Sequence, residues 1–124
     1  MEALGRHLLE ELCGCDEGIL NDREAIERIM NEAALASGAT VLESVFHRFN
    51  PHGISGVVVI AESHFAIHTW PEFRYAAVDI FTCGDDVDPG KAARVITEKL
   101  EAQSHSLIEL RRGIMEDSQV GCAK

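Results

Sequence analysis

Residues Glu62 to Glu72 concentrate the reactive side chains of this 124-residue chain. The segment reads Glu-Ser-His-Phe-Ala-Ile-His-Thr-Trp-Pro-Glu, so the hydroxyl of Ser63 lies five residues before the imidazole of His68. Downstream, Cys83 supplies a thiol at the end of another strand-like run. A hydroxyl, an imidazole and a thiol at strand ends are the groups that covalent chemistry at a carbonyl requires.

Ser63 also has a simpler explanation, because serines at strand reversals often satisfy only the hydrogen bonds of the turn. Its surroundings favour a chemical role, since an acid precedes it, His68 could approach it and Ser55 lies on the preceding predicted strand. If the chain reverses near Ser63, residues 55–60 pair with residues 65–70. Paired strands bring side chains within hydrogen-bond reach of one another.

Cys83 is followed by a glycine and by three acids within five residues. Negative neighbours favour the protonated thiol, which suits a proton donor better than a nucleophile. A buried cysteine that serves only as a small apolar residue is equally compatible with the pattern. Because no secretion signal is evident, we expect all four cysteines, Cys122 included, to be free thiols.

Metal binding is an alternative for two pairs of residues. Cys13 and Cys15 are too close for an ordinary structural zinc pair, and no second cysteine pair completes a tetrahedral site. His64 and His68 would share one face of a strand, but Glu72 is the one further candidate ligand nearby. We therefore expect no metal site.

The bulk composition limits the class of protein. A chain of this length suits one compact domain, residues 1–124, and an apolar content of 46% allows a modest core. No apolar run approaches the ~20 residues of a membrane span, so we expect a cytoplasmic protein without a membrane partner.

The net charge of 11 − 21 = −10 argues against nucleic acid as a partner. An acidic surface modestly favours a cationic ligand, although solubility explains it equally well.

Two helices are predicted. The four residues from Asn21 are typical of a helix start, with Asn21 as the cap and Glu24 reaching back, and Gly38 would end this helix. Asp88 as a cap with Pro89 in the first turn predicts the second helix. Each helix carries an apolar stripe at helical spacing, formed by Ile26, Ile29, Met30, Ala33 and Ala34 in the first and by Ala92, Val95, Ile96 and Leu100 in the second.

The remaining patterns predict a sheet. Strands are expected over 40–49, 55–60, 65–70, 75–83 and 106–110, residues 4–12 are ambiguous between helix and strand, and a polar tail is expected from residue 115. Short loops imply that consecutive strands pair. The fold class is therefore α+β, a two-layer sandwich of a mainly antiparallel sheet with two helices on one face.

Three segments together resemble the small prokaryotic S-adenosylmethionine decarboxylase proenzymes: residues 55–64, residues 67–72 and residues 76–84. The pattern Glu-Ser-His…His-Thr-Trp-Pro-Glu followed by Phe-Thr-Cys-Gly is highly specific. The likeness extends from Leu4 through the second predicted helix, which is most of the chain.

The resemblance implies a self-processing enzyme. In that family the serine matching Ser63 attacks the carbonyl of the preceding residue, here Glu62, and the amide becomes an ester. Loss of the α-hydrogen and β-elimination then split the chain into residues 1–62, the β chain, and residues 63–124, the α chain. Ser63 becomes a pyruvoyl group, a covalent cofactor made from the chain itself.

The resemblance also assigns roles in catalysis. The processing base matches His68, the serine that assists processing matches Ser55, and the proton donor of turnover matches Cys83. The pyruvoyl carbonyl would form a Schiff base with the amine of S-adenosylmethionine and accept the electron pair released with carbon dioxide. The product would be the aminopropyl donor of spermidine synthesis.

Substrate binding and assembly follow from the same resemblance. Phe49 would stack on the adenine, Glu72 would hold the ribose hydroxyls, and aromatic faces such as that of Trp70 would attract the sulfonium cation. In the family's dimer of cleaved protomers, each active site takes residues from both chains. One chain supplies the positions of Ser63 and Cys83, and the other supplies those of Phe49, Ser55, His68 and Glu72.

Two alternatives stay open at this point. A pyruvoyl-dependent decarboxylase of ornithine or arginine could use the same scaffold, because an acidic pocket suits a basic amino acid as well as a sulfonium. The second alternative is a non-catalytic α+β dimer that binds a metal or another ligand.

Overall fold

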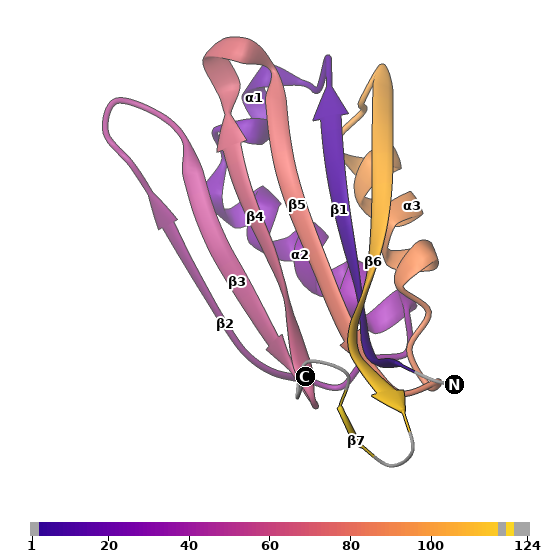
Figure 1. Cartoon of the computed structure of the whole chain (residues 1–124). Coiled ribbons are helices and arrows are strands. Elements are labelled where there is room, and N and C mark those ends of the chain that lie inside the picture. Colours follow the sequence, from indigo (N-terminus) through magenta and orange to yellow (C-terminus); the bar gives the residue numbers. More distant parts are fainter. Residues whose placement is uncertain (1–2, 117–118, 121–124) are drawn as a thin grey trace.

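The computed structural model describes residues 3–116 and 119–120, and a single antiparallel sheet dominates it (Figure 1). The helices lie behind one face of this sheet in the view of Figure 1. This confirms the predicted α+β two-layer sandwich. The elements in chain order are β1 (Ala3–Cys13), α1 (Glu17–Leu20), α2 (Arg23–Ala36), β2 (Val41–Arg48), β3 (Ile54–Ile60), β4 (Ser63–Trp70), the 3-10 turn η1 (Pro71–Phe73), β5 (Tyr75–Cys83), α3 (Pro89–Lys99), β6 (Ser104–Glu116) and β7 (Gln119–Val120).

The strand order is β2-β3-β4-β5-β1-β6-β7. Strands β2 to β5 follow one another in space as in the chain, which confirms the predicted pairing of consecutive strands. β1, which was ambiguous from the sequence, is a central strand between β5 and β6. It pairs along nearly its whole length on both sides, from Gly5 opposite Cys83 to Cys13 opposite Tyr75 on the β5 side.

Helix α2 begins one residue later than its predicted cap implies. The side chain of Asp22, not that of Asn21, accepts the hydrogen bond from the Ala25 N–H at 3.1 Å. The side chain of Asn21 instead accepts from the Gly53 N–H at 3.0 Å and so fixes the β2–β3 turn. The prediction that Asn21 caps this helix was therefore wrong. Asn21 and Asp22 are both favourable capping residues. Because the side chain of Asn21 is bonded to Gly53, Asp22 caps the helix.

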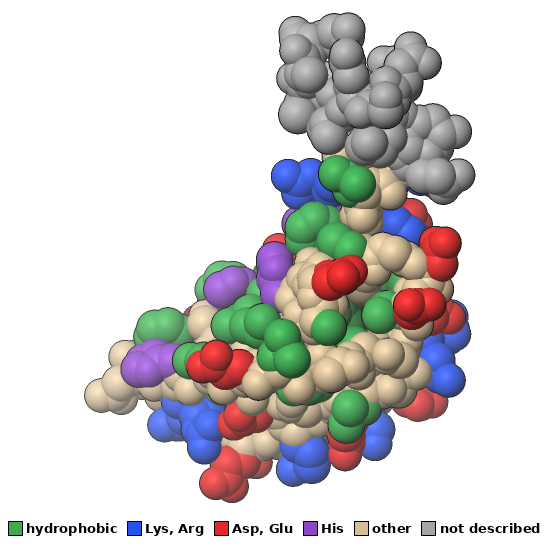
Figure 2. Space-filling model, turned by 90° about the horizontal axis from the view of Figure 1, so that it is seen from below, with side chains coloured by type: hydrophobic (Ala, Val, Ile, Leu, Met, Phe, Trp, Pro, Cys, Tyr) green, Lys and Arg blue, Asp and Glu red, His purple; other side chains and the backbone are tan. Residues whose placement is uncertain are grey.

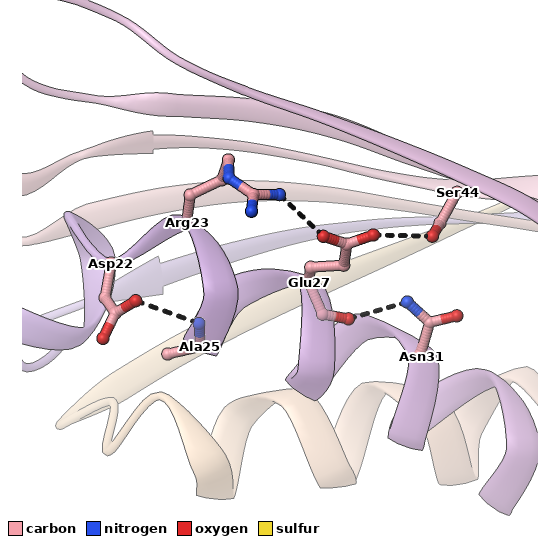
Figure 3. A network of polar contacts seen from close by, with 6 residues as sticks. All are labelled: Asp22, Arg23, Ala25, Glu27, Asn31 and Ser44. Atoms are coloured by element: carbon pink, nitrogen blue, oxygen red, sulfur yellow. Dashed lines mark hydrogen bonds and ion pairs between the residues drawn. The ribbon is translucent and has the colours of Figure 1, made fainter.

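Glu27 links α2 to the neighbouring strand β2 (Figure 3). Its carboxylate pairs with Arg23 one turn earlier at 2.8 Å and accepts a hydrogen bond from the Ser44 hydroxyl at 2.8 Å. The backbone carbonyl of Glu27 accepts from the side-chain amide of Asn31. These contacts hold the polar flank of α2 against the sheet, while the predicted apolar stripe of the helix is buried.

Helix α3 has the predicted start. Asp88 caps it by accepting from the Lys91 N–H, and Pro89 occupies the first turn. Ala92, Ile96 and Leu100 are fully buried, and Val95 packs at the edge of the core. The structure adds two short elements that the sequence did not predict, the single-turn helix α1 and the turn η1.

The pleat sorts the side chains of the sheet into two sets. Even-numbered residues of β3 and β5, and those of β1 from Leu8 onward, face the helices and are buried or half-buried, as Leu8, Val58 and Val78 show. In β4 the odd-numbered residues, such as Phe65 and Ile67, take this direction. The opposite side chains lie on a face that none of the described helices covers, which we call the open face.

Large apolar side chains remain exposed on the open face. By register and alternation it carries Val45, Val59, Trp70, Ile108 and Leu110, each at least a third exposed. Figure 2 views the molecule from one end of the strands, with the open face along the upper side, where hydrophobic and histidine side chains gather. Charged side chains lie mainly along the lower side, over the helices. Such a one-sided apolar surface is typical of an interaction face.

Strand β6 is longer than predicted. It runs from Ser104 to Glu116 instead of over 106–110, and its end pairs with β7. The expected polar tail from residue 115 is therefore wrong for residues 115–116 and 119–120. Residues 117–118 and 121–124, and with them Cys122, lie outside the described residues. Cys13, Cys15 and Cys83 are free thiols.

A buried acid lies on the helix side of the sheet. Glu10 on β1 is 2% exposed, and its Oε2 accepts a hydrogen bond from the Thr97 hydroxyl on α3. Its Oε1 has no hydrogen-bond partner in the described part of the chain. Burial raises the pKa of Glu10, while the Thr97 hydrogen bond and nearby His105 act in the opposite direction.

We predict that Glu10→Gln stabilises the fold more at pH 7 than at pH 4. As the pH rises above about 4.5, the unfolded chain releases the Glu10 proton while the folded chain retains it. The free energy of unfolding of the wild type therefore falls until the folded carboxyl also ionises, and the glutamine removes this loss. Urea unfolding of both proteins at each pH measures the difference. An advantage of the variant that shrinks as the pH rises would contradict the assignment.

Candidate active site

Ser55 and His68 form a close polar pair on the open face. They lie directly opposite each other on β3 and β4, as the predicted reversal near Ser63 requires. The Ser55 hydroxyl lies 2.7 Å from Nδ1 of His68, and their hydrogen bond holds the imidazole in one orientation. The register of two strands thus converts a sequence separation of 13 residues into a direct contact.

Ser63 and Cys83 lie at the other end of the sheet. Ser63 begins β4 and Cys83 ends β5, and both ends lie at the bottom of Figure 1. Glu62 and Cys83 line one cavity of about 1040 Å³, together with Gly84, Arg6 and Arg111 among others. The hydroxyl oxygen of Ser63 is buried and has no hydrogen-bond partner within residues 3–116 or 119–120. We call Glu62, Ser63 and Cys83 the cleavage half.

His68 cannot approach Ser63 within one chain. Five residues along a strand span about 16 Å, at the usual rise of about 3.3 Å per residue. An odd spacing also directs the two side chains to opposite faces of the sheet, because the pleat has a period of two. The expectation that His68 could reach Ser63 of the same chain was therefore wrong.

The predicted substrate-binding residues lie at the His68 end. Trp70 ends β4, Phe49 follows β2, and Glu72 lies in η1, all toward the top of Figure 1. We call these three residues, with Ser55 and His68, the binding half. Phe49 and Trp70 are 47% and 39% exposed, so both present an aromatic surface that the core does not use.

Each binding residue has a neighbour that fixes its position. Trp70 packs between Tyr75, at 5.4 Å between ring centroids, and the imidazole of His68. Phe49 makes an edge contact with His47 at 4.6 Å. Glu72 pairs with Nε2 of His52 at 3.0 Å, across the loop that follows β2.

The backbone at Glu62 has a strained conformation. Its φ of 72° lies in the left-handed region, in the tight turn between β3 and β4. For a residue with a Cβ this conformation costs roughly 1 kcal/mol or more. The strain is located at the residue whose carbonyl carbon is joined to the nitrogen of Ser63.

The structure reveals an aromatic and basic cluster beside the cleavage half that we did not predict. The His7 ring stacks on Phe81 at 5.1 Å, His64 meets the edge of Phe81, and Arg112 lies over the same ring at 5.6 Å. Nε2 of His7 approaches the Asp79 carboxylate at 3.7 Å. These residues come from four strands, so only the register of β1 between β5 and β6 could have revealed their proximity.

The described residues hold no group of three or more His, Cys, Asp or Glu side chains placed to bind a metal ion. His64 and His68 both lie on the open face, as their spacing predicts, but Glu72 does not complete a ligand set with them. Within the same ranges no helix is long and apolar enough to cross a membrane.

A family model described as S-adenosylmethionine decarboxylase matches residues 6–113. The chain belongs to this family. Curated relatives named S-adenosylmethionine decarboxylase proenzyme include a protein from Caldicellulosiruptor saccharolyticus, 59% identical over 94% of both chains. Another, from Clostridium tetani, is 60% identical over 94% of this chain and 92% of its own. These findings confirm the resemblance inferred from the residue patterns.

A solved decarboxylase of the S-adenosylmethionine family confirms the fold. The crystal structure of the adenosylmethionine decarboxylase from Aquifex aeolicus VF5 superimposes with a TM-score of 0.88 at 36% identity. The match covers 94% of this chain and 97% of that one. The chain is thus similar to that decarboxylase over nearly its full length.

Proposed function

We propose that this chain is the proenzyme of a pyruvoyl-dependent decarboxylase of S-adenosylmethionine. Its membership in the decarboxylase family supports the reaction and the substrate. The observation that carries the assignment of residues is the division of the site into two halves at opposite ends of the sheet. The product, decarboxylated S-adenosylmethionine, would supply aminopropyl groups for spermidine synthesis.

The cleavage half fits self-processing between Glu62 and Ser63. No described residue makes a hydrogen bond with the Ser63 hydroxyl, so none competes with its attack on the carbonyl carbon of Glu62. That attack moves the acyl group from nitrogen to oxygen, which breaks the strained turn peptide and relieves the φ of 72° at Glu62. Elimination across the Cα–Cβ bond of Ser63 then releases the carboxylate of Glu62 and leaves a dehydroalanine at residue 63. This residue tautomerises to an imine, water hydrolyses the imine, ammonia leaves, and residues 63–124 keep a pyruvoyl terminus.

Cys83 is placed to act in turnover. It lines the same cavity as Glu62 and stands at the strand end beside Ser63. The pyruvoyl group supplies an electron sink for the pair released as carbon dioxide leaves. The Cys83 thiol then delivers a proton to the substrate α-carbon, where the position of the donor decides the outcome.

The binding half suits the adenosine and sulfonium parts of the substrate. The exposed ring of Phe49 offers a stacking surface for adenine, and Glu72 offers carboxylate oxygens to the ribose hydroxyls. Trp70 offers an aromatic face to the sulfonium cation. Ser55 orients His68 for its role as the processing base.

We further propose that two copies complete the site by packing their open faces together. In a two-fold arrangement the same surface of each copy meets its counterpart, and antiparallel stacking places the cleavage half of one chain against the binding half of the other. The separation of about 16 Å along β4 excludes assembly of the site within one chain. Exposed apolar residues such as Val59 and Ile108 supply the contact area.

The first prediction concerns cleavage itself. The purified wild type should contain two fragments, with the second blocked at its N-terminus, and should release labelled carbon dioxide from S-adenosylmethionine but not from ornithine or arginine. Ser63→Ala should remain one inactive chain, because no hydroxyl remains to attack, whereas Ser104→Ala at the start of β6 should cleave normally. Intact mass spectrometry and the release assay decide, and fragments from Ser63→Ala would refute the mechanism.

The second prediction tests the shared site with mixed dimers. A Ser63→Ala chain and a His68→Ala chain are each expected to be inactive, but together they form one complete site per dimer. Purified mixed dimers should therefore regain about half of the wild-type activity. The matched control pairs wild type with a chain that carries both substitutions, which leaves no complete site. Activity in the control dimer together with none in the dimer of single substitutions would show that each site lies within one chain.

The third prediction separates processing from turnover. Cys83→Ala should still yield fragments, but its kcat should fall by roughly 100-fold or more, the usual contribution of a positioned proton donor. Cys13→Ala, which removes an exposed thiol at the far end of the sheet, should keep normal kcat. Steady-state kinetics on the cleaved proteins provides the measurement, and unchanged turnover in Cys83→Ala would remove that residue from its role.

A further inference from the structure

Tyr75 lies next to the binding half without belonging to it. It begins β5, directly opposite Trp70 of β4 on one side and Cys13 of β1 on the other. By register and alternation all three side chains lie on the open face. The phenol ring of Tyr75 packs on the indole of Trp70, with 5.4 Å between the ring centroids and 35° between the ring planes. A second aromatic ring from the neighbouring strand thus flanks Trp70.

Glu11 on β1 holds the outer end of the Tyr75 ring. The phenol hydroxyl donates a hydrogen bond to Oε1 of Glu11. The two residues are diagonal neighbours in the β1–β5 ladder, a relation that long side chains can bridge. Burial and this hydrogen bond raise the pKa of Tyr75 to about 12, so the phenol remains a donor at neutral pH. The ring is therefore held at both ends, by the backbone of β5 and by a carboxylate of β1.

The small side chain of Ala77 leaves room for these contacts. Ala77 lies opposite Glu11 in the β1–β5 ladder and opposite His68 in the β4–β5 ladder. The imidazole of His68 in turn lies 6.4 Å from the indole of Trp70, measured between ring centroids, and it is bonded to Ser55. Contacts across four strands therefore connect a carboxylate on β1 with the oriented imidazole on β4.

The packing of the core does not explain the hydrogen bond between Glu11 and Tyr75. Glu11 is exposed and Tyr75 is half-buried, both on the open face. A hydrogen bond at such a position adds little net stability, because water can replace it. Its main effect is on orientation, since a ring with a fixed tip cannot turn away from the indole. A binding surface that is ordered in advance loses less conformational entropy when a ligand arrives.

We propose that Tyr75 and Glu11 are positioning residues of the substrate site: their hydrogen bond holds the Tyr75 ring against Trp70 and so orients the indole before the substrate binds. This inference rests on the proposed role of Trp70 as the aromatic surface for the sulfonium. Neither residue touches the reacting atoms. Loss of the hydrogen bond weakens substrate binding and leaves the chemical steps intact, because Ser63 and Cys83 lie at the other end of the sheet.

Fluorescence tests the positioning without any substrate. The chain contains one tryptophan and one tyrosine, so selective excitation of the indole reports on Trp70 alone. Glu11→Ala removes the acceptor, and Tyr75→Phe removes the hydroxyl but keeps the ring. Both should lower the fluorescence anisotropy of Trp70 in the purified, cleaved protein, because the indole gains motion. Glu11→Gln keeps a carbonyl oxygen as an acceptor and should stay near the wild-type value.

Steady-state kinetics tests the consequence for the substrate. Glu11→Ala and Tyr75→Phe should each raise the KM for S-adenosylmethionine roughly fivefold, about the loss of one hydrogen bond, without a change in kcat or self-cleavage. A chain with both substitutions should be no worse than either single variant, because both act through one bond. Glu11→Gln should keep a KM near that of the wild type. Glu98→Ala removes an exposed carboxylate from α3 and should match the wild type in KM and anisotropy.

The positioning role and the proposed function can fail independently. A wild type that does not turn over S-adenosylmethionine would refute the proposed function, while the anisotropy of the same protein would still test the positioning. Unchanged anisotropy in both Glu11→Ala and Tyr75→Phe would overturn the inference, as would an equal rise of KM in Glu98→Ala. A fall in kcat or in cleavage as large as the change in KM would also overturn it, because the pair would then serve the fold as a whole.

Discussion

The register of β4 between its two neighbours is the constraint on which the site depends. Hydrogen bonding to β3 places Ser55 opposite His68, and hydrogen bonding to β5 places His64 opposite Phe81. A slip of one residue would turn every side chain of β4 to the other face, which would bury His68 and expose Phe65. The same apolar residues that hold the helix side of β4 in the core therefore hold the reactive residues in place.

The described helices leave one face of the sheet uncovered, and this face is available for contact with another chain. This face carries exposed aromatic rings and the oriented imidazole of His68. A second copy packed on it would bury the apolar surface and would also complete the active site that we propose. The helix side, in contrast, closes over its core within one chain, and charged residues dominate its outer surface (Figure 2). The two faces of one sheet thus serve stability and assembly separately.

The sequence predicted most of what local signals determine. The meander from β2 to β5 follows from short loops, and α3 follows from Asp88 and Pro89. The central place of β1 could not be predicted, because its partners lie about 60 to 110 residues away in the chain. The cluster around Phe81 was missed for the same reason, and the cap of α2 was misassigned because Asn21 had a competing partner.

The division of the candidate site between two chains came from the family resemblance and stays a prediction. Residue types and the family pattern selected Ser63, His68 and Cys83, whereas strand geometry shows that the first two cannot meet within one chain. The spacing of five residues already contained this information, since an odd separation on a strand directs side chains to opposite faces.

The place of β1 has a consequence for a chain cut after residue 62. β1 would belong to the first fragment, yet its hydrogen-bonding neighbours on both sides, β5 and β6, would belong to the second. The two fragments would therefore remain associated, because neither could dissociate without breaking the hydrogen bonds in the middle of the sheet. The peptide bond in the β3–β4 turn could thus be broken while the rest of the domain stays folded as one unit.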